Sequence, residues 1–212
     1  MDPTREVVGT ELTTVILILV LISKFISGSE DIDSSIYNAE ILILLIASTQ
    51  YLITLTLTDL RQIQRLRYLD WALTTPLLLF TYWKLGQTRG YTGSFLSLLI
   101  PNILMIFFGY LAEFPELIDY TIDVKVLYIL SSAALVFVLY QIYLITRFLH
   151  DQDFDTKSIE YFFYIGWTAY GLNFLVPNEC LRQSIFNVLD LINKGVYSLY
   201  LDNVIKSNSV TI

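Results

Sequence analysis

The chain has 212 residues, of which 55% are hydrophobic and only 16% are charged. This balance is typical of a protein that crosses a membrane several times and excludes an ordinary soluble domain. The formal net charge of −7 argues against a nucleic-acid partner. The single cysteine, Cys180, excludes an internal disulfide and a metal cluster of the cysteine type.

Seven segments approach the roughly 20 apolar residues that cross a bilayer as a helix. In chain order they are about 10–28, 37–58, 65–85, 93–113, 123–147, 158–177 and 182–205. The loops between them are short, so we expect one domain over 1–212. The predicted fold class is an all-α membrane protein, with seven transmembrane helices in a bundle and the lipid bilayer as its first partner.

The first segment follows a polar start and lacks a small-residue cleavage site, so we expect no cleaved signal peptide. Lysines and arginines at the segment ends, Lys24 among them, slightly favour an extracellular N-terminus under the positive-inside rule. We therefore expect an integral membrane protein, placed in the plasma membrane.

The depth in the membrane of two polar residues of the second segment can be compared with that of residues in the third. Adjacent antiparallel helices place residues at one depth when these are equidistant from the connecting loop, which here centres near residues 60 and 61. Tyr51 then lies level with Asp70, and Glu40 lies level with Thr81. Glu40 sits about 16 Å along the helix axis from the depth of Asp70, at 1.5 Å per residue.

The third segment carries charged and hydroxyl side chains on one helical face. Arg67, Asp70 and Thr74 follow each other at spacings of three and four residues, so they point the same way. Thr81, eleven residues past Asp70, returns to nearly the same face. The simplest reading of Arg67 and Asp70 alone is a structural ion pair.

The seventh segment places Lys194 near its middle, one helical turn after Asp190. An ionisable side chain at membrane depth costs at least ~2.5 kcal/mol, so such residues usually have a function. A buried amine beside a buried acid is the arrangement expected for a lysine that carries a protonated Schiff base. About the loop near Cys180, Tyr170 lies level with Asp190 and Trp167 lies close to Lys194.

Together these segments resemble the microbial (type 1) rhodopsins, of which bacteriorhodopsin is one. The third helix of that family carries Arg-Tyr-x-Asp-Trp-x-x-Thr-Thr-Pro-Leu-Leu, and residues 67–78 match every fixed position. The seventh helix carries Asp-x-x-x-Lys, which Asp190 and Lys194 match. The short loops and compact length resemble the giant-virus branch of the family.

The resemblance implies a retinal protein. Lys194 would bind all-trans retinal as a protonated Schiff base, and Asp70 would be its counter-ion and proton acceptor. Asp190 would be the second carboxylate, and Arg67 would balance the pair from the outer side. Tyr51 and Tyr170 would hydrogen-bond Asp190, and Trp71 and Trp167 would enclose the polyene. The other implied pocket residues are Thr75, Leu78, Met105, Gly109, Ser131, Ser132, Tyr170 and Phe174.

Some positions depart from the family pattern. Gly171 and Phe174 stand where relatives carry proline and tryptophan, which alters the ring end of the pocket. Leucine at Leu78 goes with green absorption in this family. At Thr81, proton-pumping relatives often carry a carboxylic acid that returns a proton to the Schiff base. Glu40, at the same depth, would be the replacement donor, a channel-lining residue, or a solvated helix end.

The sequence favours a light-driven outward proton pump rather than an enzyme. The alternative is a light-gated cation channel, which a polar series of Glu40, Asn173, Asn187 and Asn193 would suit. For Asn173 and Asn187 the simpler reading is an interhelical hydrogen bond. A photosensor is less favoured. The expected partners are protons or other small cations, and other copies of the chain in a homo-oligomer, either a trimer or a pentamer.

Overall fold

The computed structural model describes residues 3–28, 32–118, 122–152 and 157–209, which form seven helical rods. The first five rods are α1 (Pro3–Ser27), α2 (Ser34–Thr54), α3 (Leu60–Thr88), α4 (Leu96–Glu113) and α5 (Val124–Asp151). The sixth comprises α6 (Lys157–Tyr161), the π-helical segment η2 (Phe162–Trp167) and α7 (Thr168–Asn173). The seventh comprises α8 (Glu179–Asp190), the π-helical segment η3 (Leu191–Val196) and α9 (Tyr197–Ser209). A short 3₁₀ turn, η1 (Pro115–Leu117), follows α4. The predicted seven-helix fold is confirmed.

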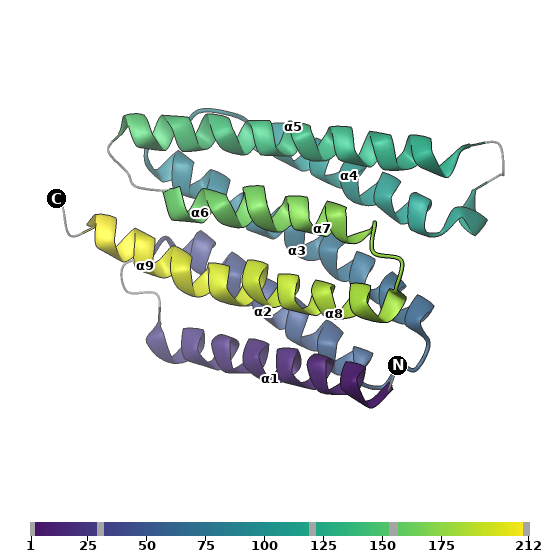
Figure 1. Cartoon of the computed structure of the whole chain (residues 1–212). Coiled ribbons are helices and arrows are strands. Elements are labelled where there is room, and N and C mark those ends of the chain that lie inside the picture. The colour runs from purple at the N-terminus through teal and green to yellow at the C-terminus, as the bar shows by residue number, and fades with distance from the viewer. Residues whose placement is uncertain (1–2, 29–31, 119–121, 153–156, 210–212) are drawn as a thin grey trace.

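The rods run side by side and close into a ring (Figure 1). Each rod packs against the next one in the chain, and the first rod also packs against the seventh, through α8 and η3. The chain begins and ends at opposite ends of the bundle (Figure 1). We call these the N-terminal end, where α1 begins, and the C-terminal end, where α9 finishes.

Four of the rods begin at an acidic or amide side chain that caps the first turn. The carboxylates of Asp33, Asp59 and Asp123 each accept a hydrogen bond from the backbone two residues later, at 2.8–2.9 Å. Asn178 accepts one from Leu181 N at 3.0 Å. Because these caps pair free N–H groups of the first turn, each helix can begin directly after a tight connection.

The caps also explain where the predicted helix limits were wrong. The second helix ends at Thr54, not at 58, because residues 55–57 turn back toward the cap at Asp59. The sixth rod ends at Asn173, not at 177, since a turn and the cap at Asn178 follow it. The third helix extends beyond 65–85 at both ends. Its first and last turns are polar, so they were not counted in the predicted apolar segment.

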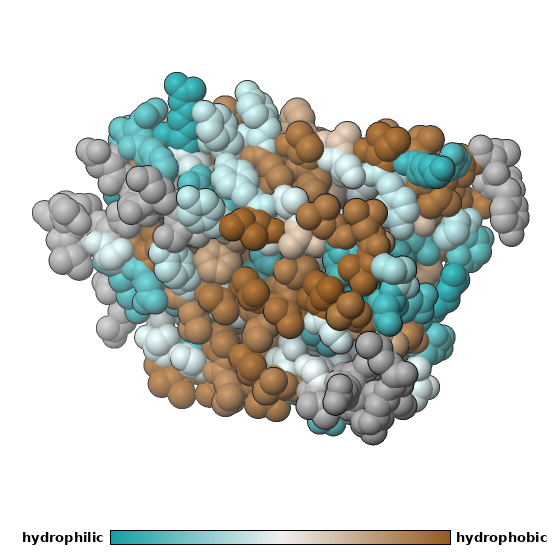
Figure 2. Space-filling model, in the orientation of Figure 1, coloured by the Kyte–Doolittle hydropathy of each residue, from teal (hydrophilic) through white to brown (hydrophobic). Residues whose placement is uncertain are grey.

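The bundle is apolar outside and partly charged inside. Large apolar side chains such as Leu19, Val136 and Ile165 are exposed, and apolar residues gather over the middle of the visible face, with hydrophilic ones toward its ends (Figure 2). Four described helices are long and apolar enough to span a membrane: Gly9–Ser27, Ser34–Thr54, Leu96–Glu113 and Val124–Asp151. Of the other three rods, α3 carries too many charged residues, and the sixth and seventh are each divided by a π-helical segment into shorter α-helices. Lipid as the surrounding solvent accounts for this distribution.

A cluster of apolar and aromatic side chains fills the C-terminal half of the bundle. Its best-buried members include Leu79, Tyr82, Phe163, Tyr197 and Leu201, each no more than 2% exposed. We call these five residues the apolar plug. The plug separates the middle of the bundle from its C-terminal end.

Candidate functional site

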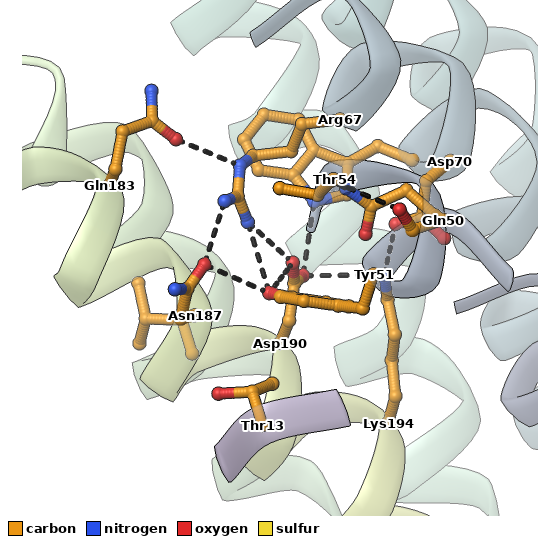
Figure 3. Close-up of polar contacts among 12 residues, drawn as sticks. Thr13, Gln50, Tyr51, Thr54, Arg67, Asp70, Gln183, Asn187, Asp190 and Lys194 are labelled. Atoms are coloured by element: carbon orange, nitrogen blue, oxygen red, sulfur yellow. Dashed lines mark hydrogen bonds and ion pairs between the residues drawn. The ribbon is translucent and has the colours of Figure 1, made fainter. Parts of the chain in front are cut away.

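Lys194 lies in the π-helical segment of the seventh rod and is almost completely buried. Its Nζ atom contacts Oδ2 of Asp70 on α3 and lies 3.3 Å from Oδ1 of Asp190, one turn earlier on its own rod. The structure therefore brings together the three residues that the sequence placed at the centre of the site (Figure 3).

Asp190 is surrounded by hydrogen-bond donors. Its Oδ2 atom accepts from Arg67 Nη1 at 2.8 Å and from Tyr51 Oη at 2.9 Å. Its Oδ1 atom accepts from Trp71 Nε1 at 3.1 Å and from Tyr170 Oη at 2.6 Å. Four donors from four different side chains stabilise the negative charge of this carboxylate.

Asp70 has a much poorer set of partners. Its Oδ2 atom contacts Lys194, whereas its Oδ1 atom is buried without a hydrogen-bond partner among the described residues. The hydroxyl of Thr74 donates to the backbone carbonyl of Asp70 at 2.9 Å, not to its carboxylate. Thr74, on the same helical face, thus contacts the backbone of Asp70, and one carboxylate oxygen of Asp70 accepts no hydrogen bond from the described residues.

The centre is balanced in charge. Arg67 and a protonated Lys194 supply two positive charges, and Asp70 and Asp190 supply two negative ones. Burying charges is tolerated when they are paired and hydrogen-bonded, and all four side chains here are at most 1% exposed. Neutrality explains how so polar a cluster exists at membrane depth.

Arg67 is held on its far side by amide side chains that the sequence reading did not single out as partners. Its Nε atom donates to Gln183 Oε1 at 3.2 Å, and its Nη2 atom donates to Asn187 Oδ1 at 2.8 Å. Gln183 in turn donates to Gln64 Oε1 at 2.5 Å. Gln183 lies seven residues before Asp190, two helical turns on the same face, and that spacing was the available signal.

Asn173 and Asn187 make interhelical hydrogen bonds. Asn173 donates to the backbone carbonyl of Arg182 at 2.9 Å, and Asn187 accepts from Arg67 and donates to Thr10 Oγ1 at 3.2 Å. Asn187 also borders a cavity of about 200 Å³ at the N-terminal end, which we call the vestibule. The vestibule is lined by Thr10, Thr54, Leu55, Leu57, Thr58, Leu60, Ile63, Arg67, Gln183, Ser184 and Asn187.

A mostly apolar pocket extends from Lys194 between the third, fourth, fifth and sixth rods. All but one of the predicted pocket residues line it, namely Trp71, Thr75, Leu78, Met105, Gly109, Ser131, Ser132, Trp167, Tyr170, Phe174 and Lys194. Tyr51 is the exception, because it lies behind Asp190 and does not border the pocket. The sequence reading missed the lining residues Tyr68, Ile106, Tyr128 and Leu135.

The pocket suits a long apolar group joined to an amine. Its single ammonium, Lys194, stands at one end beside two carboxylates, and aromatic and aliphatic side chains form most of the walls. Its walls are fixed by hydrogen bonds: Asn102 donates to Thr75 Oγ1 at 3.0 Å, and Ser131 donates to the Met105 carbonyl at 2.8 Å. Retinal attached to Lys194 therefore fits the residues present.

The pocket wall also depends on a glycine in the sixth rod. A Cβ atom at Gly166 would lie 2.2 Å from Oδ1 of Asn193, which borders the pocket beside Lys194. Asn193 is held in place because its Nδ2 atom donates to the Leu189 carbonyl at 2.9 Å. The close approach of the two π-helical segments thus requires a residue without a side chain at this position.

Glu40 and Thr81 lie in the C-terminal half but have different partners. Thr81 shares a hydrogen bond of 2.8 Å with Tyr197 Oη. Glu40 is 1% exposed, so its reading as a solvated helix end is wrong. Its carboxylate accepts from Lys24 Nζ at 2.7 Å, and the same nitrogen lies 2.6 Å from Asp202 Oδ2. No pattern in the sequence predicts this three-residue contact.

Comparison with known proteins agrees with this architecture. The family model for bacteriorhodopsin-like proteins matches residues 7–208. The rhodopsin of Exiguobacterium sibiricum is 20% identical with a TM-score of 0.82, and the match covers 100% of both chains. The proton pumping rhodopsin AR2 from the marine alga Acetabularia acetabulum is 20% identical with a TM-score of 0.75, covering 99% of this chain and 97% of that one.

A viral rhodopsin, OLPVRII, is also 20% identical, with a TM-score of 0.76 and coverage of 98% of this chain and 99% of that one. A search of curated proteins gave no match. The likeness to solved structures shows the fold, and the family model extends over nearly the whole chain. The protein therefore belongs to the bacteriorhodopsin-like family of microbial rhodopsins, integral membrane proteins that bind retinal through a lysine Schiff base.

Proposed function

We propose that this protein is a light-driven outward proton pump in which Lys194 carries retinal and Asp70 accepts the proton. The observation that carries the proposal is the difference in hydrogen bonding between the two carboxylates beside Lys194. Asp190 is saturated by four donors, whereas Asp70 keeps one buried oxygen without a partner among the described residues. Of the two, Asp70 is the one prepared to receive a proton.

When bound, retinal supplies the light-driven change of shape that alters the surroundings of the Lys194 nitrogen. The residues of the chain then direct the proton. A proton held at Nζ of Lys194 passes to the carboxylate of Asp70, whose Oδ2 atom is in contact with that nitrogen. Asp190 stays negative because Arg67, Tyr51, Trp71 and Tyr170 hold its charge, so the site retains a counter-ion throughout.

The return of a proton from the opposite side is assigned to Glu40. It is the carboxylate on α2 beside the apolar plug, and its side chain has no exposed surface. Packed residues of the plug keep bulk water away from Lys194 on this side, so a proton from that direction needs a carrier inside the bundle. With the N-terminus extracellular and the C-terminal end in the cytoplasm, this order of transfers moves protons outward.

The fold is compatible with this assignment, since the similar protein AR2 is described as proton pumping. The choice of Asp70 as proton acceptor rests on the hydrogen bonding of Asp70 and Asp190, and replacing Asp70 tests it. Asp70→Asn should still form a pigment, absorb at longer wavelength because the negative charge near Lys194 is lost, and transport no protons. Asp151→Asn, at the exposed end of α5, is the matched control and should pump normally. Pumping by Asp70→Asn at the wild-type rate would contradict the mechanism.

A light-gated cation channel is the second candidate, and the vestibule is the observation that favours it. Polar side chains from the first, second, third and seventh rods border this cavity, which reaches Arg67. The apolar plug argues against a continuous path beyond Lys194. Glu40→Gln distinguishes the two candidates. A pump should return its proton more slowly and recover with added azide, a small acid that carries protons, whereas a channel should change its conductance or selectivity.

A further inference from the structure

The buried cluster of Lys24, Glu40 and Asp202 joins three rods near the C-terminal end of the bundle. Lys24 on α1 bridges the carboxylates of Glu40 on α2, at 2.7 Å, and Asp202 on α9, at 2.6 Å. The side chains of Lys24 and Glu40 have no exposed surface, and the side chain of Asp202 is 12% exposed. The cluster thus runs from near the surface to a fully enclosed carboxylate.

The charges of this cluster do not balance without an extra proton. Two ionised carboxylates and one ammonium would leave a net negative charge in a buried place, which is strongly unfavourable. One added proton makes the cluster neutral. The more enclosed carboxylate, Glu40, is the better holder of that proton, because Asp202 retains some contact with water to solvate its charge.

One oxygen of each carboxylate is buried without a close hydrogen-bond partner among the described residues, namely Glu40 Oε1 and Asp202 Oδ1. The Ser198 hydroxyl lies beside the Glu40 carboxylate and interacts with it, and Tyr197 is another titratable side chain next to Glu40. The hydroxyl of Tyr37 donates to the Lys24 carbonyl at 3.1 Å, so it holds the backbone of the cluster and not its charges. Unpaired buried oxygens mark sites for bridging water, which would connect the two carboxylates.

The same groups lie on a route to the centre of the protein. Lys194, Ser198 and Asp202 follow each other at intervals of four residues, so they share one face of the seventh rod. The distance along the axis from Lys194 to Asp202 is about 12 Å at 1.5 Å per residue. This row of three side chains passes beside the apolar plug and ends at the partly exposed carboxylate of Asp202.

We propose that Asp202 is a second carboxylate of the proton donor, sharing one proton with Glu40 across Lys24. This inference rests on the proposed function, in which Glu40 returns a proton to the Lys194 nitrogen. At rest Glu40 holds the proton and Asp202 is ionised beside the Lys24 ammonium. When Glu40 gives up its proton, Asp202 takes one from water at the C-terminal end and passes it to Glu40. Lys24 stays charged throughout and acts as a positioning residue.

The inference makes a charge-counting prediction for the dark, retinal-bound protein. Infrared absorption by protonated carboxylic acid groups reports how many protons the cluster holds. The wild type should show a Glu40 band that disappears in Glu40→Gln. In Asp202→Asn the ammonium faces a single carboxylate, so Glu40 should ionise and its band should also disappear. In Lys24→Met together with Asp202→Asn, the cation is gone and the Glu40 band should return.

After a light flash, the proton should return to Lys194 quickly in variants whose Glu40 is protonated at rest and slowly in variants whose Glu40 is ionised. Asp202→Asn should slow the return of the proton to Lys194 by about tenfold or more, because a positioned acid is lost. Lys24→Met/Asp202→Asn should recover part of that rate, and Lys24→Arg should behave like the wild type. Lys24→Met alone leaves two buried carboxylates without a cation, which opposes folding, so the double variant carries the test. Asp151→Asn is the control for an exposed carboxylate at the same end.

Two results would overturn the inference. One is a Glu40 band that persists in Asp202→Asn, and the other is a flash response of Asp202→Asn equal to that of Asp151→Asn. Neither result contradicts the proposed pump, provided that Glu40→Gln still slows the return of the proton to Lys194. Conversely, if the wild type proves not to pump, the infrared count still decides whether the carboxylates share a proton.

Discussion

Replacing Arg67 with methionine should destabilise the protein far more than replacing any surface arginine. Arg67 is 1% exposed and donates to Asp190, Tyr51, Asn187 and Gln183. Methionine keeps much of the aliphatic stem but removes the guanidinium that donates to Asp190, so the buried centre is left with one positive charge for two carboxylates. Removing one partner of a buried ion pair costs about 3–5 kcal/mol, which for a chain of this size is a fall of about 6–20 °C in melting temperature.

The control for this substitution is Arg61→Met. Arg61 also pairs with a carboxylate, Glu116 Oε1 at 2.7 Å, but its side chain is 64% exposed. Exposed ion pairs contribute about 0–1 kcal/mol, so the melting temperature should change by no more than about 4 °C. Thermal unfolding of the retinal-bound protein, followed by loss of visible absorption, measures both variants in one assay.

A double variant separates lost charge from lost packing. Arg67→Met combined with Asp190→Asn removes the excess negative charge, so it should be more stable than Arg67→Met with Asp190 intact. The reasoning is refuted if Arg67→Met melts within 2–3 °C of the wild type, roughly 1 kcal/mol for this chain length. It is equally refuted if the two substitutions are simply additive, because residues that share a buried charge pair must couple.

Two further predictions concern local structure. Gly166→Ala should destabilise the protein by about 1–3 kcal/mol and weaken pigment formation, because its Cβ atom would overlap Asn193; Gly9→Ala, where no atom lies within 4 Å, should show no loss in the same melting and reconstitution assays. Asp33→Ala removes a helix cap and should cost about 1 kcal/mol in thermal unfolding at neutral pH. The hydrogen bond from the Ser35 side chain is the main cause that lowers the pKa of Asp33 below its usual 3.8. Its contribution is therefore complete above that value and is lost as the pH falls through the lower folded pKa, where wild type and variant should converge; a constant difference down to that pH would contradict the capping role.

The centre of the site was predictable because it depends on short-range regularities. Helical spacing placed Arg67 and Asp70 on one face, and short loops placed Tyr51 and Tyr170 at the depth of the carboxylates. Both tyrosines do donate to Asp190 in the structure. Depth in a helical bundle follows from counting residues away from a loop, which one sequence is enough to do.

The cluster at the C-terminal end was not predictable in the same way. Lys24, Glu40 and Asp202 meet only because three rods are rotated so that these side chains face inward. Rotation about the helix axis is set by the packing of all seven rods, and no local pattern in the first rod identifies Lys24 as inward-facing. Sequence reasoning placed Lys24 among the charges at a helix end, whereas it is 1% exposed.

The π-helical segments were missed for a related reason. The segments Phe162–Trp167 and Leu191–Val196 lie opposite each other and include Trp167 and Lys194. Their residues are ordinary for a membrane helix, so composition does not reveal the extra residue per turn. The widened turns reflect how the sixth and seventh rods pack around Asn193 and the pocket, which is a property of the tertiary structure.

Photocurrent measured against voltage shows directly whether light drives protons outward through Lys194 and Asp70. The measurement uses retinal-supplied cells, first with the same cation solution on both sides and then with different ones. If the protein is this pump, an outward current should flow at zero voltage, should not reverse over the accessible range and should be lost in Asp70→Asn. A current that reverses and follows the cation gradient would contradict this expectation and identify a channel. A visible pigment that gives no current would contradict it as well.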